Sequence, residues 1–150
     1  LKNEIILLAN KMKISFYELA KFITYNSTNH TRSRILLTES LIEKQDWKGA
    51  RNQIKTLLEE CKIWKTTHEE FPTDVQEMID EGEGNISKST LKKWAFEIDL
   101  QQSSDGSSDL EGTINATSLE DMPGGADKKV CFDVETGRYT GYGTKEECAG

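Results

Sequence analysis

Hydrophobic residues recur every three or four positions through the first hundred residues, which is the spacing of one face of an α-helix. This pattern predicts helix from about residue 3 to residue 23, with Lys13-Ile14-Ser15 as a candidate break within it. Ser15 is followed three residues later by Glu18, the capping-box spacing that begins a new helix. A further helix is predicted over residues 31–43.

The most regular pattern is an unbroken heptad stripe. Its members are Trp47, Ala50, Ile54, Leu57, Cys61, Trp64, His68 and Phe71, separated by alternating steps of three and four residues. Asp46 is a candidate N-cap for this helix, and Pro72 should end it. The stripe spans about 37 Å at 1.5 Å per residue, more than the preceding helix can cover. We therefore expect it to join subunits in a homo-oligomer, with one long helix of a monomeric bundle as the alternative. The oligomerisation residues are Trp47, Ala50, Ile54, Leu57, Cys61, Trp64 and Phe71.

Beyond Pro72 the pattern weakens and then changes. Short helices are predicted over residues 73–81 and 87–99. Residues 101–127 are rich in Ser, Asp, Gly, Thr and Glu, so we expect a disordered acidic linker. Residues 128–150 alternate around a Gly137 turn and predict a β-hairpin. A lone hairpin is marginal in water, so it must dock on a partner or be held by a Cys131–Cys148 bridge, and the sequence leaves these alternatives open.

These patterns predict an all-α fold, a helical hairpin or bundle with a long heptad helix, followed by the linker and the small β-hairpin. The predicted divisions are a helical N-terminal unit at 1–30, a helical hairpin at 31–71, a short helical pair at 72–100, the linker at 101–127 and the hairpin tail at 128–150.

Charge is distributed unevenly along the chain. Residues 1–56 hold ten basic and five acidic residues, so their net charge is +5. The remaining residues carry a net charge of −12, which gives −7 for the whole chain. The basic front suits contact with a polyanion. Only 35% of residues are hydrophobic and no apolar run approaches the roughly 18 residues of a membrane helix, so no membrane partner is expected. Three cysteines without a Cys-x-x-Cys motif, and no secretory leader, favour the cytoplasm.

The inventory of reactive residues predicts no enzyme. No phosphate-binding loop, zinc-ligand spacing or nucleophile elbow is present. Cys61 and His68 are about 10 Å apart along a helix, too far for a catalytic pair. The acidic run from Asp80 fails as a calcium loop, because its twelfth residue is Leu91 rather than a glutamate. We therefore expect no catalytic residue, no cofactor and no metal.

Residues 5–23 resemble the helix-turn-helix family. Leu8, Ala9 and Met12 occupy the packing positions of a first helix, Ile14 enters the turn, and Leu19 and Phe22 anchor a second helix. Lys13 departs from the family, which has glycine there, and one continuous helix is the alternative. The resemblance implies binding of double-stranded DNA through Ser15, Tyr17 and Lys21 of the second helix. Phosphate contacts would come from Lys11, Lys13, Lys21, Arg32 and Arg34.

In layout the chain resembles the small terminase subunits of tailed bacteriophages. That resemblance implies a non-enzymatic, ring-forming DNA-recognition subunit for viral genome packaging in the host cytoplasm, with the heptad stripe building the ring. The tail at 128–150 would contact a protein partner. The competing interpretation is an α-helical adaptor or structural protein that binds its partner through the 31–71 hairpin and the tail. In this second case residues 41–59 are similar to a single tetratricopeptide unit.

Overall fold

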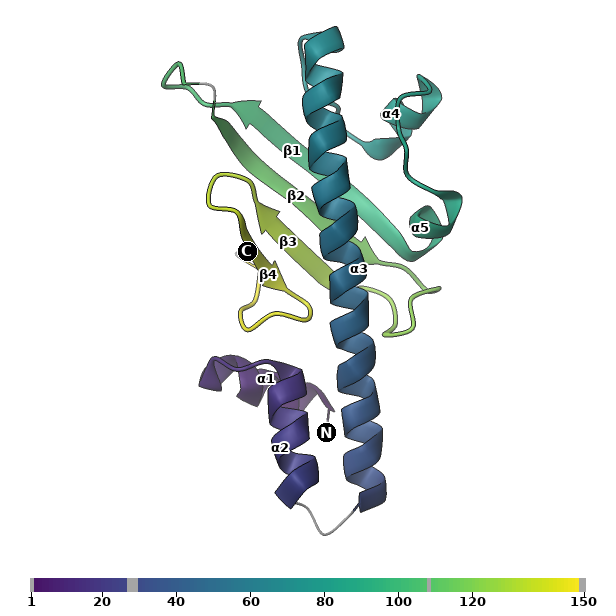
Figure 1. Cartoon of the computed structure of the whole chain (residues 1–150), viewed down its shortest axis with the longest axis vertical. Helices are drawn as coiled ribbons and strands as arrows, with labels where there is room; N and C mark the ends of the chain where they lie inside the picture. The colour runs from purple at the N-terminus through teal and green to yellow at the C-terminus, as the bar shows by residue number, and fades with distance from the viewer. Residues whose placement is uncertain (1, 27–29, 108, 149–150) are drawn as a thin grey trace.

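A long helix lies across a four-stranded antiparallel sheet in the computed structural model, which describes residues 2–26, 30–107 and 109–148 (Figure 1). The helices are α1 (Lys2–Met12), α2 (Phe16–Asn26), α3 (His30–His68), α4 (Val75–Asp80) and α5 (Lys88–Lys93). The strands are β1 (Trp94–Gln102), β2 (Leu110–Ser118), β3 (Lys129–Asp133) and β4 (Arg138–Gly141). This is a mixed α+β fold, so the all-α prediction is wrong.

The two helices predicted on either side of Asp46 are one continuous helix, α3. Residues 44–46, between the two predicted helices, contain no glycine or proline that would break a helix, and the Asp46 side chain bonds to distant loops instead of capping. The helix ends at His68, before Pro72, and Glu69 adopts a positive φ of 64° directly after it. Phe71 therefore lies outside the helix, where it packs half-buried against the core.

The sheet is a simple meander in the order β1-β2-β3-β4. Its covered face is apolar, because alternate residues of each strand point towards α3. These inward residues are Trp94, Phe96, Ile98, Ile114, Ala116, Val130 and Phe132. They form one core with the buried residues of the heptad stripe. The sheet thus supplies the long covering surface that the stripe requires.

Two sequence predictions fail in this sheet. Residues 87–99 are not one helix: Ser87 caps the short helix α5, and β1 begins at Trp94. From Trp94 to Ile98 buried and exposed residues alternate, which is a strand pattern. The disordered linker predicted at 101–127 is also wrong, because β2 pairs with β1 on one side and β3 on the other. Few of its residues are apolar, but neighbours on both sides satisfy its backbone and bury Ile114 and Ala116.

Helix α2 packs against the part of α3 that extends beyond the sheet, and α1 packs against α2 (Figure 1). Their small core consists of Ile5, Ala9, Phe16, Leu19, Ala20 and Leu36. The predicted capping box is confirmed, since the Ser15 hydroxyl accepts from the Glu18 amide and the Glu18 carboxylate accepts from the Ser15 amide. We call α1, α2 and residues 30–46 of α3 the helical unit.

The C-terminal hairpin forms as predicted, with β3 and β4 joined through Gly137. It is the edge of the larger sheet and is also held by a disulfide between Cys131 and Cys148. The hairpin therefore uses both of the supports that the sequence had left as alternatives.

Candidate functional site

The outer face of α2 carries two exposed aromatic side chains. Phe22 is 65% exposed and Tyr25 is 90% exposed, while Phe16, Leu19 and Ala20 on the opposite face are buried. Phe22 and Tyr25 line a shallow hollow of about 350 Å³ together with Glu18, Lys21 and Asn26. We call these five residues the outer face of α2. An exposed aromatic pair on a helix that already buries its other side is a candidate interaction surface.

Exposed apolar side chains are concentrated in the helical unit. The large hydrophobic residues exposed in the described part of the chain are Leu7, Leu8, Met12, Phe22, Tyr25, Ile35, Leu41 and Ile63. Seven of these eight lie in the helical unit, although it is less than a third of the chain. Scattered exposed apolar residues are normal, but this concentration makes the helical unit the stronger candidate for an interaction surface.

The residues predicted to bind DNA all lie in the helical unit, on α1, α2, the turn between them and the start of α3. Lys11, Lys13, Lys21, Arg32 and Arg34 are exposed. Ser15 is occupied as a helix cap, and Tyr17 is half-buried beside the Lys44 ammonium group, which lies 4.4 Å from its ring centroid. Tyr17 also lines a pocket with Trp47 and Gly143. The exposed side of α2 therefore offers aromatic rings, one acid and one base, rather than the two polar residues that the resemblance placed there.

The residues predicted to build an oligomer are inside the chain. Ala50, Ile54, Leu57 and Cys61 are fully buried and Trp64 nearly so, all against the sheet of the same chain. Trp47 and Phe71 are partly buried against the same core. Burial raises the pKa of the Cys61 thiol to about 12, so it stays protonated and shielded.

Two carboxylates of α3 lie where the helical unit meets the sheet. One Glu43 oxygen accepts from the Gly143 amide at 3.0 Å, and its other oxygen is buried with no hydrogen-bond partner among the described residues. One Asp46 oxygen accepts from the Gly124 amide and from the Tyr142 hydroxyl, each at 3.0 Å. Burial raises the pKa of both carboxyls, opposed by these hydrogen bonds. We call Glu43 and Asp46 the junction carboxylates, because they fasten two loops of the sheet to α3.

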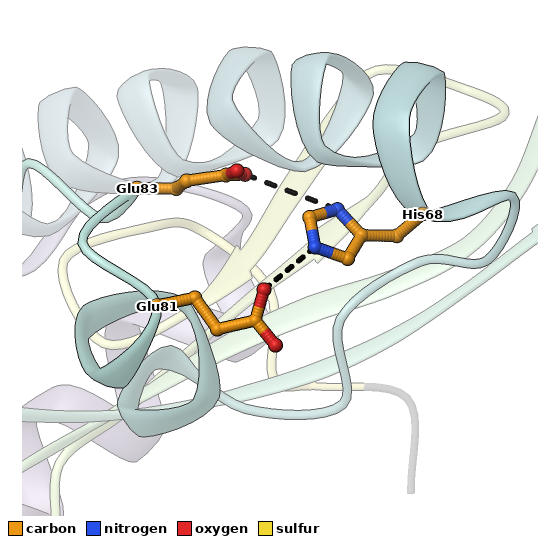
Figure 2. Close-up of side chains that lie close together, drawn as sticks. All are labelled: His68, Glu81 and Glu83. Carbon is orange, nitrogen blue, oxygen red and sulfur yellow. Dashed lines mark hydrogen bonds and ion pairs between the residues drawn. The ribbon is translucent and has the colours of Figure 1, made fainter.

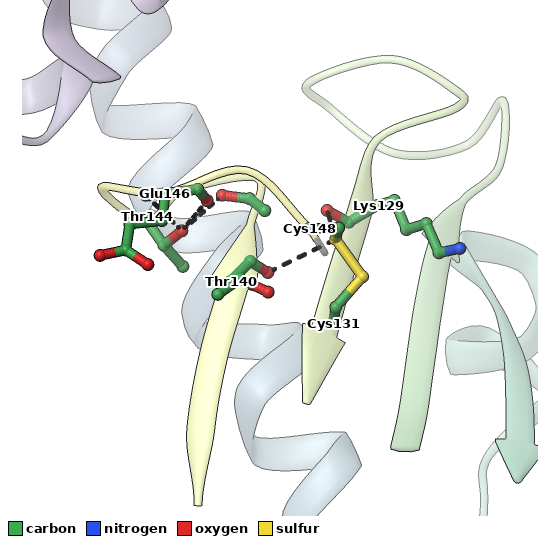
Figure 3. The surroundings of a disulfide bond; sticks show 7 residues. Lys129, Cys131, Thr140, Thr144, Glu146 and Cys148 are labelled. Carbon is green, nitrogen blue, oxygen red and sulfur yellow. Dashed lines mark hydrogen bonds between the residues drawn. A yellow bond between two sulfur atoms is a disulfide. The ribbon is translucent and has the colours of Figure 1, made fainter. Parts of the chain in front are cut away.

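The disulfide closes the loop that reaches these carboxylates. Cys148 lies beside Cys131 and near the backbone of Lys129 and Thr140, and the turn at Thr144 folds back towards it (Figure 3). The Gly141 amide donates to the Glu146 carbonyl at 2.7 Å. This arrangement fixes residues 141–148 in the position from which Tyr142 and Gly143 contact α3.

A second cluster of ionisable groups lies at the other end of α3. The Nε2 atom of His68 is 2.7 Å from Oε2 of Glu81, and its Nδ1 atom is 3.9 Å from Oε2 of Glu83 (Figure 2). The imidazole stacks on the Trp64 ring at 3.7 Å between centroids. The hydrogen bond to Glu81 is the main reason that the pKa of His68 is raised. We call His68, Glu81 and Glu83 the histidine cluster.

Sequence reasoning missed both polar sites. His68 was interpreted as part of the heptad stripe, and Glu81 and Glu83 were considered only as calcium ligands. Asp46 was interpreted as a helix cap. A possible signal was the occurrence of Ser40, Glu43 and Asp46 at three-residue steps in line with the apolar stripe, but nothing in the sequence identifies the loops that they contact.

No helix in the described ranges combines the length and the apolar character needed to cross a bilayer. Comparisons of the chain with known protein families, with curated proteins and with solved structures find no match.

Proposed function

We propose that this chain is a non-enzymatic protein-interaction module whose helical unit binds an apolar segment of a partner protein. The observation that carries this proposal is the exposure of Phe22 and Tyr25 on a helix whose other face is already buried. Aromatic side chains that bury a large area dominate the energetics of protein interfaces. Covering these two rings would be the main source of affinity.

The arrangement of the core supports the helical unit as the binding surface. The adaptor interpretation used a 31–71 hairpin, but that segment is one helix whose apolar stripe is covered by the sheet. Outside the helical unit, the described residues expose a single large hydrophobic side chain, Ile63 of α3. A partner that recognises apolar surface therefore has more to contact on α1, α2 and the start of α3.

The charge on the outer face of α2 favours a protein over a polyanion or an anionic membrane. Glu18 and Lys21 flank the aromatic rings and cancel in charge. Phosphate recognition and adsorption to anionic lipid both require several positive charges on the contacting face. DNA binding by the basic residues of the helical unit stays a prediction, and it would leave Phe22 and Tyr25 without a role.

Site-specific photo-crosslinking tests this proposal. A photoreactive residue at position 22 or 25 should give one discrete protein adduct in cells that express the chain. The matched control is position 63, since Ile63 is 64% exposed but lies on α3 outside the helical unit, and it should give no such adduct. Equal crosslinking at all three positions, or none at 22 and 25, would contradict the proposal.

Two measurements distinguish the other classes of partner. Light scattering should give the 17.0 kDa monomer, and a larger particle that Phe22→Ser dissociates would identify a second copy of the chain as the partner. Binding to a DNA duplex with a log–log salt slope of about −4 to −5, the value for five phosphate contacts, would support the DNA interpretation instead.

We further infer that the chain functions where disulfides persist. The Cys131–Cys148 bridge holds the loop that contacts both junction carboxylates. Such bridges are rare in reducing compartments, so the bridge argues against the cytoplasmic location expected from the sequence. Alkylation of free thiols before cell lysis, followed by mass spectrometry, should show Cys131 and Cys148 unmodified. Alkylation of both cysteines would contradict this inference.

A further inference from the structure

We propose that the histidine cluster is a binding site for one divalent transition-metal ion, with Zn²⁺ as the representative ion. The ligands would be Nε2 of His68 and one carboxylate oxygen each from Glu81 and Glu83. One ring nitrogen and one oxygen of each carboxylate lie within 4.8 Å of one another, with Glu81 2.7 Å from Nε2 and Glu83 3.9 Å from Nδ1. Water would complete the coordination. The three side chains come from the end of α3, the end of α4 and the turn that follows (Figure 2).

The hydrogen bonds around the imidazole determine which nitrogen is available. The Thr67 hydroxyl lies 3.1 Å from the Trp64 carbonyl, to which it donates, and its oxygen lies 2.7 Å from Nδ1 of His68. Nδ1 is also 3.2 Å from the same carbonyl, which can only accept. With its proton on Nδ1, donated to that carbonyl, the ring keeps the Nε2 lone pair free for a metal ion. This is the arrangement that most metal-binding histidines show, with the second nitrogen donating to a backbone or side-chain oxygen.

The remaining nitrogen faces a second acceptor. In the tautomer with its proton on Nδ1, Nε2 has a lone pair and lies 2.7 Å from a Glu81 oxygen that also only accepts. In that tautomer a cation between the two atoms is favourable. A proton on Nε2 is one solution, but it leaves a single positive charge beside two carboxylates. Among the described residues, no lysine or arginine forms an ion pair with Glu81 or Glu83. A divalent ion that replaces the Nε2 proton balances both carboxylates.

The site is built on a fixed frame. His68 stacks on Trp64, which is buried in the main core. The turn that carries Glu83 is held because the amides of Glu83 and Gly84 both donate to the carbonyl of buried Met78. In a tetrahedral Zn²⁺ site a ligand nitrogen and oxygen are about 3.3 Å apart, so Glu81 would retreat by about 0.6 Å. Glu83 has a 41% exposed side chain that can rotate towards Nε2.

The chemistry of the ligands selects the class of metal. Imidazole nitrogen suits Zn²⁺, Co²⁺, Ni²⁺ and Cu²⁺, whereas Mg²⁺ and Ca²⁺ prefer oxygen ligands throughout. A bound ion would connect the last turn of α3 to the α4–α5 turn. Its role would be to fix the position of these segments, and no reaction is implied.

Isothermal titration of Zn²⁺ into the untagged, chelator-treated chain tests the proposal. We expect one ion per chain and visible absorption bands when Co²⁺ replaces Zn²⁺. Glu83→Gln should weaken Zn²⁺ binding by about tenfold or more, and Glu81→Gln and His68→Gln should do the same. The controls are Glu70→Gln, an exposed acid near the site, and His30→Gln, the other histidine in the sequence. Both should bind Zn²⁺ like the unmodified chain.

Each contrary result would overturn the proposal. Zn²⁺ binding that does not saturate would show that a proton alone occupies the cluster. Unchanged affinity in Glu83→Gln, whose exposed side chain can be altered without loss of folding, would show that the ion binds elsewhere. Equal affinity for Mg²⁺ or Ca²⁺ would show a carboxylate site without the imidazole. Circular dichroism of each variant confirms that it is folded before the titration.

Discussion

The hydroxyl of Tyr142 lies 3.0 Å from Oδ2 of Asp46, across 96 positions of sequence. The same carboxylate oxygen accepts from the Gly124 amide. Three segments are thereby joined at one oxygen atom: the middle of α3, the loop between β2 and β3, and the loop that follows β4.

Tyr142→Phe should destabilise the chain by about 1–2 kcal/mol. The substitution keeps the ring but removes a hydrogen bond to a partly buried carboxylate, which is left with one donor fewer. Urea unfolding followed by tryptophan fluorescence measures the change. Tyr25→Phe is the control, because Tyr25 is 90% exposed and its loss of a hydroxyl should change stability by less than about 0.5 kcal/mol. Equal effects in the two variants would show that the Asp46 contact contributes nothing.

The stability contributed by Glu43 should fall as the pH rises. Burial raises the pKa of Glu43 above its ordinary value of 4.5, so the folded state binds the proton more tightly than the unfolded state. The contribution is therefore fully present below pH 4.5 and is lost as the pH rises through the higher pKa of the folded state. The free energy of unfolding of the unmodified chain minus that of Glu43→Gln should be larger at pH 4 than at pH 7. Glu97→Gln, at an exposed position of β1, should show no such trend, and a flat difference for Glu43→Gln would contradict the prediction.

Removal of the disulfide should cost about 3 kcal/mol, the value for a closed loop of about 15 residues. Cys131 and Cys148 are 17 positions apart. A Cys131→Ser, Cys148→Ser double variant should lose this stability in urea unfolding. Reductant should destabilise the unmodified chain by a similar amount and leave the double variant unchanged. If reductant also destabilised the double variant, the loss would not come from this bridge.

Lys13→Gly should stabilise the chain by up to about 1 kcal/mol. Lys13 has a φ of 59°, and the amides of Lys13 and Ile14 donate to the carbonyls of Asn10 and Ala9. This is a Schellman motif, in which glycine is the usual residue because a left-handed conformation strains other side chains. The ion pair between Lys13 and Glu146 is long at 3.9 Å and exposed, so losing it costs little stability.

Lys11→Gly is the matched control for this substitution. Lys11 lies within α1, and glycine there should destabilise by about 1 kcal/mol. Thermal unfolding should therefore move the two melting temperatures in opposite directions. A fall in both would show that the positive φ of Lys13 causes no strain that glycine relieves.

The local structure of the helical unit follows from the sequence. Periodicity predicted α1 and α2, and the Ser15 and Glu18 pair predicted where α2 begins. The absence of glycine at position 13 made a break there difficult to predict, because the Schellman hydrogen bonds that hold Lys13 at positive φ depend on how the chain continues after α1. The sequence also predicted the heptad stripe, because the stripe depends only on the spacing of apolar residues within one helix.

What covers that stripe was decided only by the tertiary structure. An apolar helix face has the same sequence whether it packs against another subunit or against its own sheet. The sheet was hard to predict because β2 has few apolar residues and gains its stability from strands on both sides. The contacts of Asp46 with Tyr142 and of His68 with Glu81 have the same origin. Sequence periodicity records which side of an element is buried, but the identity of the buried partner depends on contacts between segments far apart in the chain, which no local pattern contains.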